Sequence, residues 1–401
     1  MTKKRPFIEG VIVGVVITFF LSAVITRLNA QPAYSMGGAE RAVSEEFDQK
    51  TQAILNLIDK YFVGEYDIKD LEESMYLGLV YGLGDRYSSY MNRETFQDFK
   101  ERSEGVLVGI GAQVQLNPNG GGVLVVNPFE GAPAFNSGVK AGDIVTHVNE
   151  TDITAFDLEV AVSMIRGEEG STATLRLIRD GEVLEIDVVR AKFDVPTVNH
   201  RVLEDNIGYI MITGFDGVTF NQFKDALNSL KQENVKGLII DVRNNPGGLL
   251  STVYEICNLI LPEGIITYTE DKNGHKEYLH SKGDYVDLPI VVLINEYSAS
   301  ASEILAGAIQ DYERGTLVGN QTFGKGVVQR IFELTDESAV KLTVSRYYTP
   351  NGISIHGEGV TPDYIVPMEE SLTFRISSIE LEEDVQLKKA IELIGEKISL
   401  R

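Results

Sequence analysis

The sequence predicts an α/β protein in which a domain of alternating strands and helices is joined to a smaller β-rich module. Strands and helices alternate over residues 193–368, and strand–helix–strand repeats with short links are typical of a layered α/β sheet. Residues 105–192 are instead a series of short β-segments separated by glycine turns. Residues 44–104 have apolar side chains at helical spacing. These three patterns divide most of the chain.

The first thirty residues differ from everything after them. Lys3, Lys4 and Arg5 precede an uncharged apolar stretch at residues 10–26, which is about the length of a spanning helix and longer than the apolar region of most signal peptides. We therefore expect residues 1–30 to be a retained membrane anchor, with a cleaved signal segment as the alternative. Basic residues stay on the cytoplasmic side. This predicts a single-pass cell-membrane protein with its bulk on the extracytoplasmic side, or a secreted protein if the segment is cleaved.

The remaining boundaries follow changes of pattern. Residues 31–43 are mostly small and polar and predict a linker beyond the membrane. Residues 44–104 predict an N-terminal helical region. Residues 369–401 predict a C-terminal helical tail with one apolar stripe, which packs either on the domain or on a second subunit; the stripe consists of Leu387, Ile391, Ile394 and Ile398.

Composition excludes several classes of partner. The chain has 59 acidic and 36 basic residues, a formal net charge of −23. Nucleic-acid binding depends on Lys and Arg that neutralise phosphates, so we expect no nucleic-acid partner. Cys257 is the only cysteine, which excludes an intrachain disulfide and a cysteine-based metal site. The five histidines are scattered and form no metal-binding pattern, so we expect no metal.

The β-rich module, residues 105–192, has a glycine loop before a strand. "VGIG" is followed by a strand pattern, and "SGVKAGDIVTHVNETDI" comes later in the module. Over its whole length the module resembles a PDZ domain. The resemblance implies that a peptide lies along the strand after the loop, with its terminal carboxylate on loop N–H groups and its last side chain in an apolar pocket. The implied peptide-binding residues are Val108, Gly109, Ile110 and Gly111.

A helix at "DLEVAVSMIR", Asp157 to Arg166, is expected to form the other wall of this groove. Arg166 ends that helix. It is a candidate sensor that answers a bound carboxylate or touches the α/β domain. The alternative is an ordinary C-terminal charge that is favourable to the helix dipole.

The stretch "INEYSASASEILAGAIQD" places three serines on alternate positions where a buried strand turns into a helix. Serines there can cap the helix, or one can be a nucleophile, which then needs an adjacent base. No histidine is near in the sequence. Downstream, Lys325 lies between two glycines and is bounded by Phe323 and Val327. An apolar setting would lower the pKa of this lysine so that it could accept a proton, whereas an exposed loop lysine could not.

Taken together, "SASASEILAGAIQD" and "TFGKGVVQ" resemble the active site of the carboxy-terminal processing peptidases, serine peptidases with a Ser–Lys dyad. The resemblance also includes "LGDRYSSYM" and "DVRNNPGG" and covers residues 45–367, the PDZ module included. It implies a crotonase- or Clp-protease-like α/β catalytic domain at residues 193–368, with an inserted PDZ domain and an N-terminal helical cap. It implies no metal or organic cofactor. Members of the family often form dimers, which makes a homodimer a further expectation.

The resemblance assigns roles to particular residues. Ser300 is the nucleophile, Lys325 the general base, and Gln329 the residue that orients the lysine. Ser298 and Ser302 are then turn and helix-start residues that cap. Asp311 ends the serine helix, and its role is left open between structure and function.

The chemistry also requires donors for the oxyanion. Ala301 follows Ser300 at the expected helix N-terminus, where free N–H groups and the helix dipole favour negative charge. "NNPGG" ends a neighbouring parallel strand, and Gly247 or Gly248 can offer a second N–H there.

The sequence thus predicts an exported serine endopeptidase that processes or degrades proteins recognised through their free C-terminal tails. One alternative is a catalytically silent PDZ scaffold that binds peptides. The presence of Ser300, Lys325 and Gln329 disfavours it. A second alternative, a trypsin-like PDZ protease, requires a "GNSGG" turn that the sequence lacks.

Overall fold

The computed structural model describes residues 45–376, 379 and 381–400. The predicted anchor at residues 1–30 and the predicted linker at residues 31–43 lie outside these residues. Within the described part of the chain, no helix is both long enough and apolar enough to cross a membrane.

Helices form most of the described part of the N-terminal region, residues 45–104. Its three helices are α2 (Glu45–Tyr61), α3 (Ile68–Tyr81) and α4 (Arg93–Glu104). The described chain divides into two units, one ending at Leu71 and the other beginning at Glu72. Helix α4 begins where the Asn92 side chain accepts a hydrogen bond from the Thr95 N–H. It ends at Gly105, whose φ of 72° lies in the left-handed region that glycine adopts without strain.

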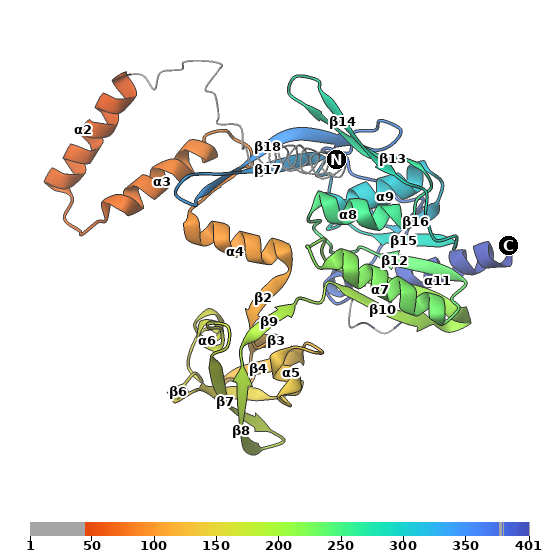
Figure 1. Ribbon diagram of the computed structural model, residues 1–401, viewed down its shortest axis with the longest axis horizontal. Coiled ribbons are helices and arrows are strands. Elements are labelled where there is room, and N and C mark those ends of the chain that lie inside the picture. Colours follow the sequence, from red (N-terminus) through yellow and green to blue (C-terminus); the bar gives the residue numbers. More distant parts are fainter. Residues whose placement is uncertain (1–44, 377–378, 380, 401) are drawn as a thin grey trace, which may run out of the picture. The chain divides into compact units, whose positions relative to one another are not determined.

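The β-rich module contains one main sheet and a separate two-stranded ribbon (Figure 1). The main sheet runs in the order β3-β4-β5-β7-β8, with β6 paired to β5, and the ribbon pairs β2 with β9. The elements are β2 (Val106–Gly109), β3 (Ala112–Leu116), β4 (Val123–Pro128), α5 (Pro133–Asn136), β5 (Ile144–Val148), β6 (Thr151–Asp152), α6 (Leu158–Ile165), β7 (Thr172–Arg179), β8 (Glu182–Val189) and β9 (Ala191–Asp194).

Strands β2 and β3 are separated at Ile110 and Gly111, within the glycine loop that the sequence indicated. Gly111 has a φ of 70°, and a Cβ there would lie 2.3 Å from the Ala132 Cβ. The chain therefore leaves the ribbon at this glycine and enters the main sheet as β3. Strand β3 forms the edge of that sheet, and one side of it is unpaired.

The larger domain is built on a six-stranded sheet in the order β10-β11-β12-β15-β16-β19, in which only β10 is antiparallel to its neighbour. Its strands are β10 (Val198–Leu203), β11 (Ile207–Ile212), β12 (Gly237–Asp241), β15 (Ile290–Ile294), β16 (Gly315–Gly319) and β19 (Tyr364–Ile365). Its helices are the 3₁₀ turn at Glu204–Asn206, α7 (Thr219–Gln232), α8 (Leu250–Asn258), α9 (Ala301–Asp311), α10 (Glu370–Thr373) and α11 (Val385–Ser399).

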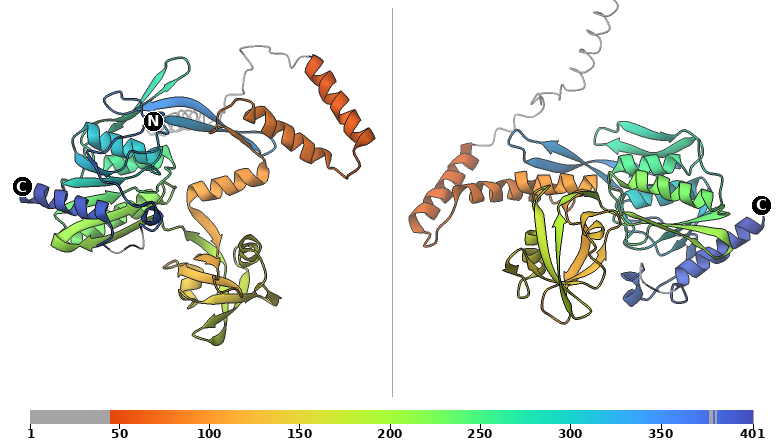
Figure 2. Two further views of the ribbon diagram at one scale, coloured as in Figure 1. Left: turned by 180° about the vertical axis from the view of Figure 1, so that it is seen from behind. Right: turned by 60° about the horizontal axis from the view of Figure 1, so that its bottom comes forward.

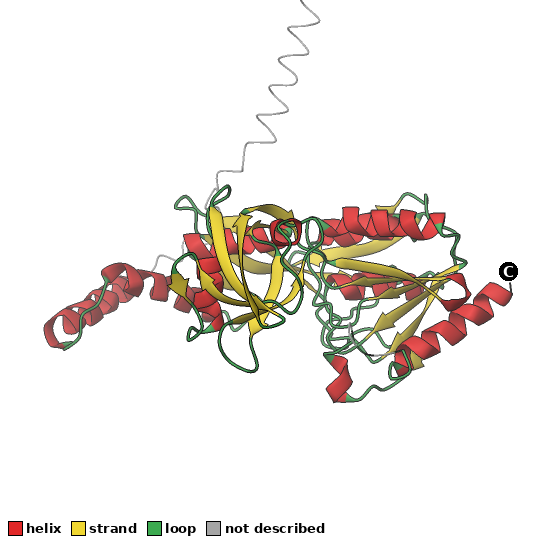
Figure 3. Ribbon diagram, turned by 90° about the horizontal axis from the view of Figure 1, so that it is seen from below, coloured by secondary structure: helices red, strands yellow, loops and turns green. Residues whose placement is uncertain are grey.

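Helices cover both faces of this sheet (Figure 3). Because side chains alternate along a strand, Ile210 and Ile212 of β11 pack in the core formed with α7, α8 and α9. Tyr209 and Met211 face the opposite core, which contains α11. The predicted α/β fold class is confirmed.

A second, antiparallel sheet lies in the same domain, in the order β1-β18-β13-β14 with β17 paired to β18. Its strands are β1 (Ser89–Met91), β13 (Gly264–Asp271), β14 (Lys276–Ser281), β17 (Val327–Glu333) and β18 (Ala339–Tyr348). The long pair β17 and β18 is blue in Figure 2. Strand β18 brings the segment before α4 into contact with the segment that follows Lys325.

The apolar stripe of the C-terminal tail packs on the domain itself. Leu387 and Ile394 are buried in the core beneath the parallel sheet, and Ile391 and Ile398 pack against it. Of the two expected partners, the domain itself and a second subunit, the stripe therefore packs on the domain. It is not an exposed surface for a second subunit.

A buried ion cluster joins the beginning of α11 to the end of β12. The Arg243 guanidinium lies 2.6 Å from an Asp241 carboxylate oxygen and 2.8 Å from an Asp384 carboxylate oxygen. The Asp384 side chain also accepts from the Leu387 N–H at the start of α11. Asn244, the next residue, donates to the Thr373 carbonyl oxygen. The tail thus fixes the loop that follows β12.

We expect Asp384→Asn to lower the free energy of unfolding by about 3 kcal/mol, because it leaves part of a buried guanidinium charge uncompensated. Asparagine keeps an oxygen that can accept at the helix start. Glu392→Gln, which removes the exposed pair with Lys389 on the same helix, is the matched control and should cost less than about 1 kcal/mol. Chemical denaturation measures both. An equally small loss of unfolding free energy in both variants would contradict a structural role for the cluster.

Candidate active site

Ser300 lies at the sharp turn between β15 and α9. Its φ of 57° and ψ of −112° are outside the regions that non-glycine residues usually occupy. Such a conformation costs about 1–3 kcal/mol and persists only where the surroundings hold it. Of the three alternating serines, Ser300 alone is partly exposed, whereas Ser298 and Ser302 are fully buried.

The sequence predicted that Ser298 and Ser302 cap the helix, but their hydroxyls do not do so. The Ser298 hydroxyl donates to the Val242 carbonyl oxygen at 2.8 Å, and the Ser302 hydroxyl donates to the Asn245 carbonyl oxygen at 2.9 Å. Both acceptors belong to the loop after β12. The two serines therefore attach the turn at Ser300 to the glycine loop beside it.

The fully buried carboxylate of Glu303 connects the Ser300 turn to the segment of Lys325. One oxygen accepts from the Ser300 and Lys325 main-chain N–H groups, each at 2.8 Å. The other accepts from the Gly324 N–H at 2.7 Å and the Thr322 hydroxyl at 2.6 Å. Hydrogen bonds to an ionised acceptor are about twice as strong as neutral ones. A single side chain thus positions both predicted dyad residues.

Tyr347 of β18 makes a second connection between the same segments. Its buried hydroxyl lies 3.0 Å from the Ser300 carbonyl oxygen and also contacts the Lys325 carbonyl oxygen. Burial, with the Glu303 charge, raises the pKa of Tyr347, so the phenol keeps its proton and remains a donor.

Lys325 is half-buried, and its ammonium lies 5.2 Å from the centroid of the Tyr87 ring. Burial and then the positive charge of Lys341 lower the pKa of Lys325, and the Glu303 carboxylate opposes them. The expected apolar setting is only partly as predicted. Val327 is buried beside the lysine, but Phe323 is 48% exposed and faces Arg86.

Ser300, Lys325 and Gln329 line the same cavity, which has a volume of about 310 Å³. Its other lining is largely apolar and comes from α4, α8, α9 and the β17–β18 pair, including Phe99, Leu250, Ile304, Val328 and Ile331. The Gln329 amide donates to the Val327 carbonyl oxygen at 3.3 Å. Its role in orienting Lys325 stays a prediction. Asp216 also lines the cavity, and burial raises the pKa of its carboxyl group.

The glycine loop after β12 approaches Ser300 closely. A Cβ on Gly247 would lie 2.8 Å from the Ser300 Cβ, and a Cβ on Gly248 would lie 2.3 Å from the Phe215 carbonyl oxygen. The Gly247 N–H donates to the Asn245 side chain at 2.9 Å. The exposed Gly248 and the helix-start residue Ala301 have N–H groups without an acceptor among the described residues. Gly247 and Gly248 were the two glycines expected to offer an N–H to the oxyanion, and of these Gly248 has the free N–H.

Asp311, at the far end of α9, accepts from the Asn351 N–H at 2.7 Å and supports a turn there. It does not line the Ser300 cavity. In the part of the chain that is described, no group of three or more His, Cys, Asp or Glu side chains is arranged to hold a metal ion.

The expected peptide groove of the β-rich module has β3 on one side and α6 among the elements packed on its core. Ile110 is buried, and its carbonyl oxygen accepts from the Ala134 N–H. Arg166 is the exposed C-cap of α6. The end of that helix is instead held by Arg190, whose buried guanidinium donates to the Ile165 and Met164 carbonyl oxygens.

Several site residues are absent from the sequence-based prediction. Glu303 was detectable, since Ser-x-x-Glu at the start of a helix is the capping-box pattern. Tyr87 lies within "LGDRYSSYM", which the sequence resemblance included without a role. Tyr347, Lys341 and Arg190 belong to ordinary strand patterns. No local signal distinguishes them.

Comparisons with known proteins show which families the chain is similar to. The family model described as Peptidase family S41 matches residues 206–366, and the model described as PDZ domain matches residues 108–189. The chain is 35% identical over 352 residues to the carboxy-terminal processing protease CtpA of Bacillus subtilis, covering 87% of this chain and 75% of that protein. It is 32% identical over 380 residues to a probable CtpA-like serine protease of Staphylococcus aureus, covering 92% and 74%.

Among solved structures, a putative S41 protease from Bacteroides fragilis is similar in fold. The TM-score is 0.53 at 18% sequence identity, with 79% of this chain and 87% of that chain covered.

We expect Lys341→Gln to raise the pKa of Lys325, because it removes a positive charge that lowers it. Less of the lysine is then neutral at a given pH. Competitive acetylation followed by peptide mass spectrometry reports the pKa of a single lysine. Lys231→Gln, at the exposed end of α7, is the control and should leave the pKa unchanged. An unchanged or lowered pKa in Lys341→Gln would show that Lys341 does not act on Lys325.

Proposed function

The chain belongs to peptidase family S41 and, within it, to the carboxy-terminal processing serine proteases, and we propose that Ser300 and Lys325 form its catalytic dyad. In this proposal Ser300 is the nucleophile, neutral Lys325 is the general base, and Gln329 orients the lysine. The silent-scaffold alternative is not favoured. The observation that carries the proposal is the buried Glu303 carboxylate, which accepts from the main chain of both residues.

The proposed reaction proceeds in two steps. Lys325 accepts the Ser300 hydroxyl proton as the Ser300 oxygen attacks the scissile carbonyl carbon. The N–H groups of Ala301 and Gly248 stabilise the oxyanion. Removing one such donor typically costs about 2.7–4 kcal/mol. The protonated Lys325 then gives its proton to the leaving amine, and a water activated by the same lysine hydrolyses the acyl-enzyme.

Low dielectric favours a neutral lysine, and this supports Lys325 as a base. Burial lowers the pKa of Lys325, so a larger fraction is unprotonated near neutral pH than for an exposed lysine. Activity should therefore rise with pH as Lys325 loses its proton. A histidine is not needed.

We also propose that the PDZ domain selects substrates by their free C-terminal tails. A tail would add to the unpaired edge of β3, with its carboxylate near the loop from Val108 to Gly111. The positive φ of Gly111 supports this, because it turns the loop main chain sharply before the edge strand. Arg166 as a sensor remains part of the proposal. Its exposed side chain is free to meet a ligand or another domain.

Two further proposals concern location and assembly. The apolar stretch at residues 10–26 would anchor the protease in the cell membrane, with the catalytic part on the extracytoplasmic side. A homodimer would form through α2. Its Ile54, Leu57 and Tyr61 lie at helical spacing and are 50%, 57% and 64% exposed.

The dyad is tested with Lys325→Arg. Arginine keeps the positive charge but stays protonated throughout the accessible pH range, so peptidase activity should fall to the level of Ser300→Ala. Lys231→Arg, on the exposed end of α7, is the matched control and should keep full activity. The thermal unfolding midpoint checks that each variant folds. Near-normal turnover of a peptide substrate by folded Lys325→Arg would exclude the dyad.

A further inference from the structure

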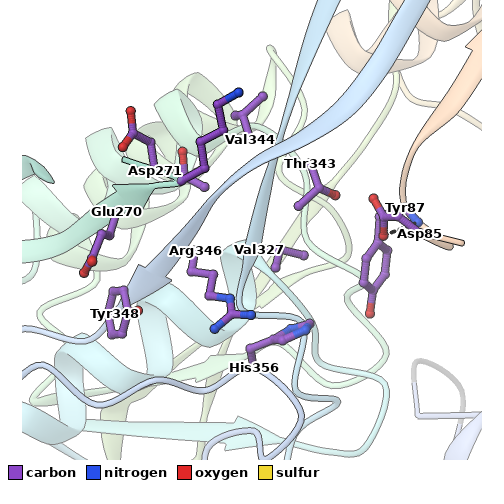
Figure 4. Close-up of a pocket in the computed structure, with 12 residues that line it drawn as sticks. Asp85, Tyr87, Glu270, Asp271, Val327, Thr343, Val344, Arg346, Tyr348 and His356 are labelled. Carbon is purple, nitrogen blue, oxygen red and sulfur yellow. Dashed lines mark hydrogen bonds between the residues drawn. The ribbon is translucent and has the colours of Figure 1, made fainter. Parts of the chain in front are cut away.

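A second cavity has a volume of about 460 Å³, and Figure 4 shows the residues that line it. It is lined by the β17–β18 pair, the end of β13, the segment before β1 and the loop after Ile355. Val327 lines this cavity and the Ser300 cavity alike. Tyr87, whose ring lies under the Lys325 ammonium, lines it too. The two cavities are therefore adjacent at the catalytic lysine.

The loop that carries His356 packs directly on the Lys325 segment. A Cβ on Gly326 would lie 2.6 Å from the His356 main-chain nitrogen, and the Gly357 N–H donates to the Gly324 carbonyl oxygen at 2.9 Å. The His356 end of the cavity is thus fixed relative to Lys325 by close main-chain contact. A group bound there is held at a defined distance from the scissile bond.

The acidic residues of the cavity already have partners. Asp85 accepts from the Ser88 hydroxyl and the Tyr87 N–H, and Asp271 accepts from the Asn273 and His275 N–H groups. Glu270 pairs with Lys276 at 3.7 Å.

The exposed Arg346 lies opposite Glu270 in the β13–β18 register, but Glu270 pairs with Lys276, and the Arg346 guanidinium makes no hydrogen bond or ion pair among the described residues. It extends from β18 toward the His356 ring (Figure 4). The guanidinium offers several N–H donors in a planar fork that matches a carboxylate. Together with Lys272 and His356, the exposed Arg346 side chain forms the basic part of the cavity lining and is available to pair with an anion.

The chemistry of the dyad decides which part of a substrate reaches this cavity. The leaving amine receives its proton from Lys325, so the chain on the leaving side extends from Ser300 past the lysine. Tyr87, Val327 and His356 lie next along that path. In a protease that cuts near a C-terminus, the leaving fragment is short and ends in a free carboxylate.

We propose that Arg346, with His356, binds the C-terminal carboxylate of the leaving fragment and so sets how far from the C-terminus the chain is cut. This inference rests on the proposed function. It adds a second reader of the tail, in the catalytic domain, to the PDZ groove. Unlike the PDZ groove, it measures the distance from the scissile bond.

The test compares peptides that share one scissile sequence and carry neutral tails of increasing length, each as free acid and as C-terminal amide. Wild type should prefer the free acid at one tail length, by about fivefold in kcat/KM, the upper end for an exposed ion pair. Arg346→Gln should lose this preference through a higher KM at unchanged kcat. Arg330→Gln, an exposed arginine on β17 outside both cavities, should retain it.

Equilibrium binding to the full chain carrying Ser300→Ala separates this inference from the proposed function. The free-acid tail peptide should occupy two sites, the PDZ groove and the cavity, and Arg346→Gln should remove one. If Ser300→Ala still cleaves like wild type, the dyad is wrong, and binding of the leaving-side fragment alone, which has no scissile bond, then decides the role of Arg346. Two sites retained in Arg346→Gln would overturn the inference. So would equal binding at the cavity by an amidated peptide with a terminal glutamate, because the site would then read any carboxylate.

Discussion

The carboxylate of Glu303 is the interaction on which the site depends. It is fully buried, and it accepts hydrogen bonds from the Ser300 and Lys325 main chain as well as from Gly324 and Thr322. A buried ionised group is costly unless its hydrogen bonds are satisfied. The charge therefore stabilises only the arrangement in which both segments converge on it. The strained backbone of Ser300 persists because Glu303 and Tyr347 hold it from both sides.

The parallel sheet supplies the frame for this arrangement. The carboxyl ends of neighbouring parallel strands meet at one edge, which brings the glycine loop after β12 beside the turn after β15. Buried polar contacts then fix the loop from both sides. The Ser298 and Ser302 hydroxyls donate to its carbonyl oxygens, and the Arg243–Asp384 pair joins it to the C-terminal tail. The C-terminal tail of the chain, although distant from Ser300 in the sequence, thus contributes to the position of the Gly248 N–H.

Local patterns in the sequence were sufficient to predict the α/β class and the helix after Ser300, whereas the roles of Ser300 and Lys325 came from the resemblance to a peptidase family and stay predictions. Contacts between distant segments were not predictable in this way. The Gly247 N–H is taken by the Asn245 side chain, and Phe323 turns outward to Arg86, although both looked suitable from their neighbours in the chain.

The most direct measurement of the central claim is the pH profile of kcat/KM for Glu303→Gln. Burial lowers the pKa of Lys325 and the Glu303 charge opposes it, so removing only the charge would make Lys325 a more available base and raise activity at neutral pH. If Glu303 instead holds the dyad in place, misplacement should lower kcat/KM by about 100-fold at every pH. A folded variant with this uniform loss is the predicted result. Activity at neutral pH equal to or above wild type would contradict the account.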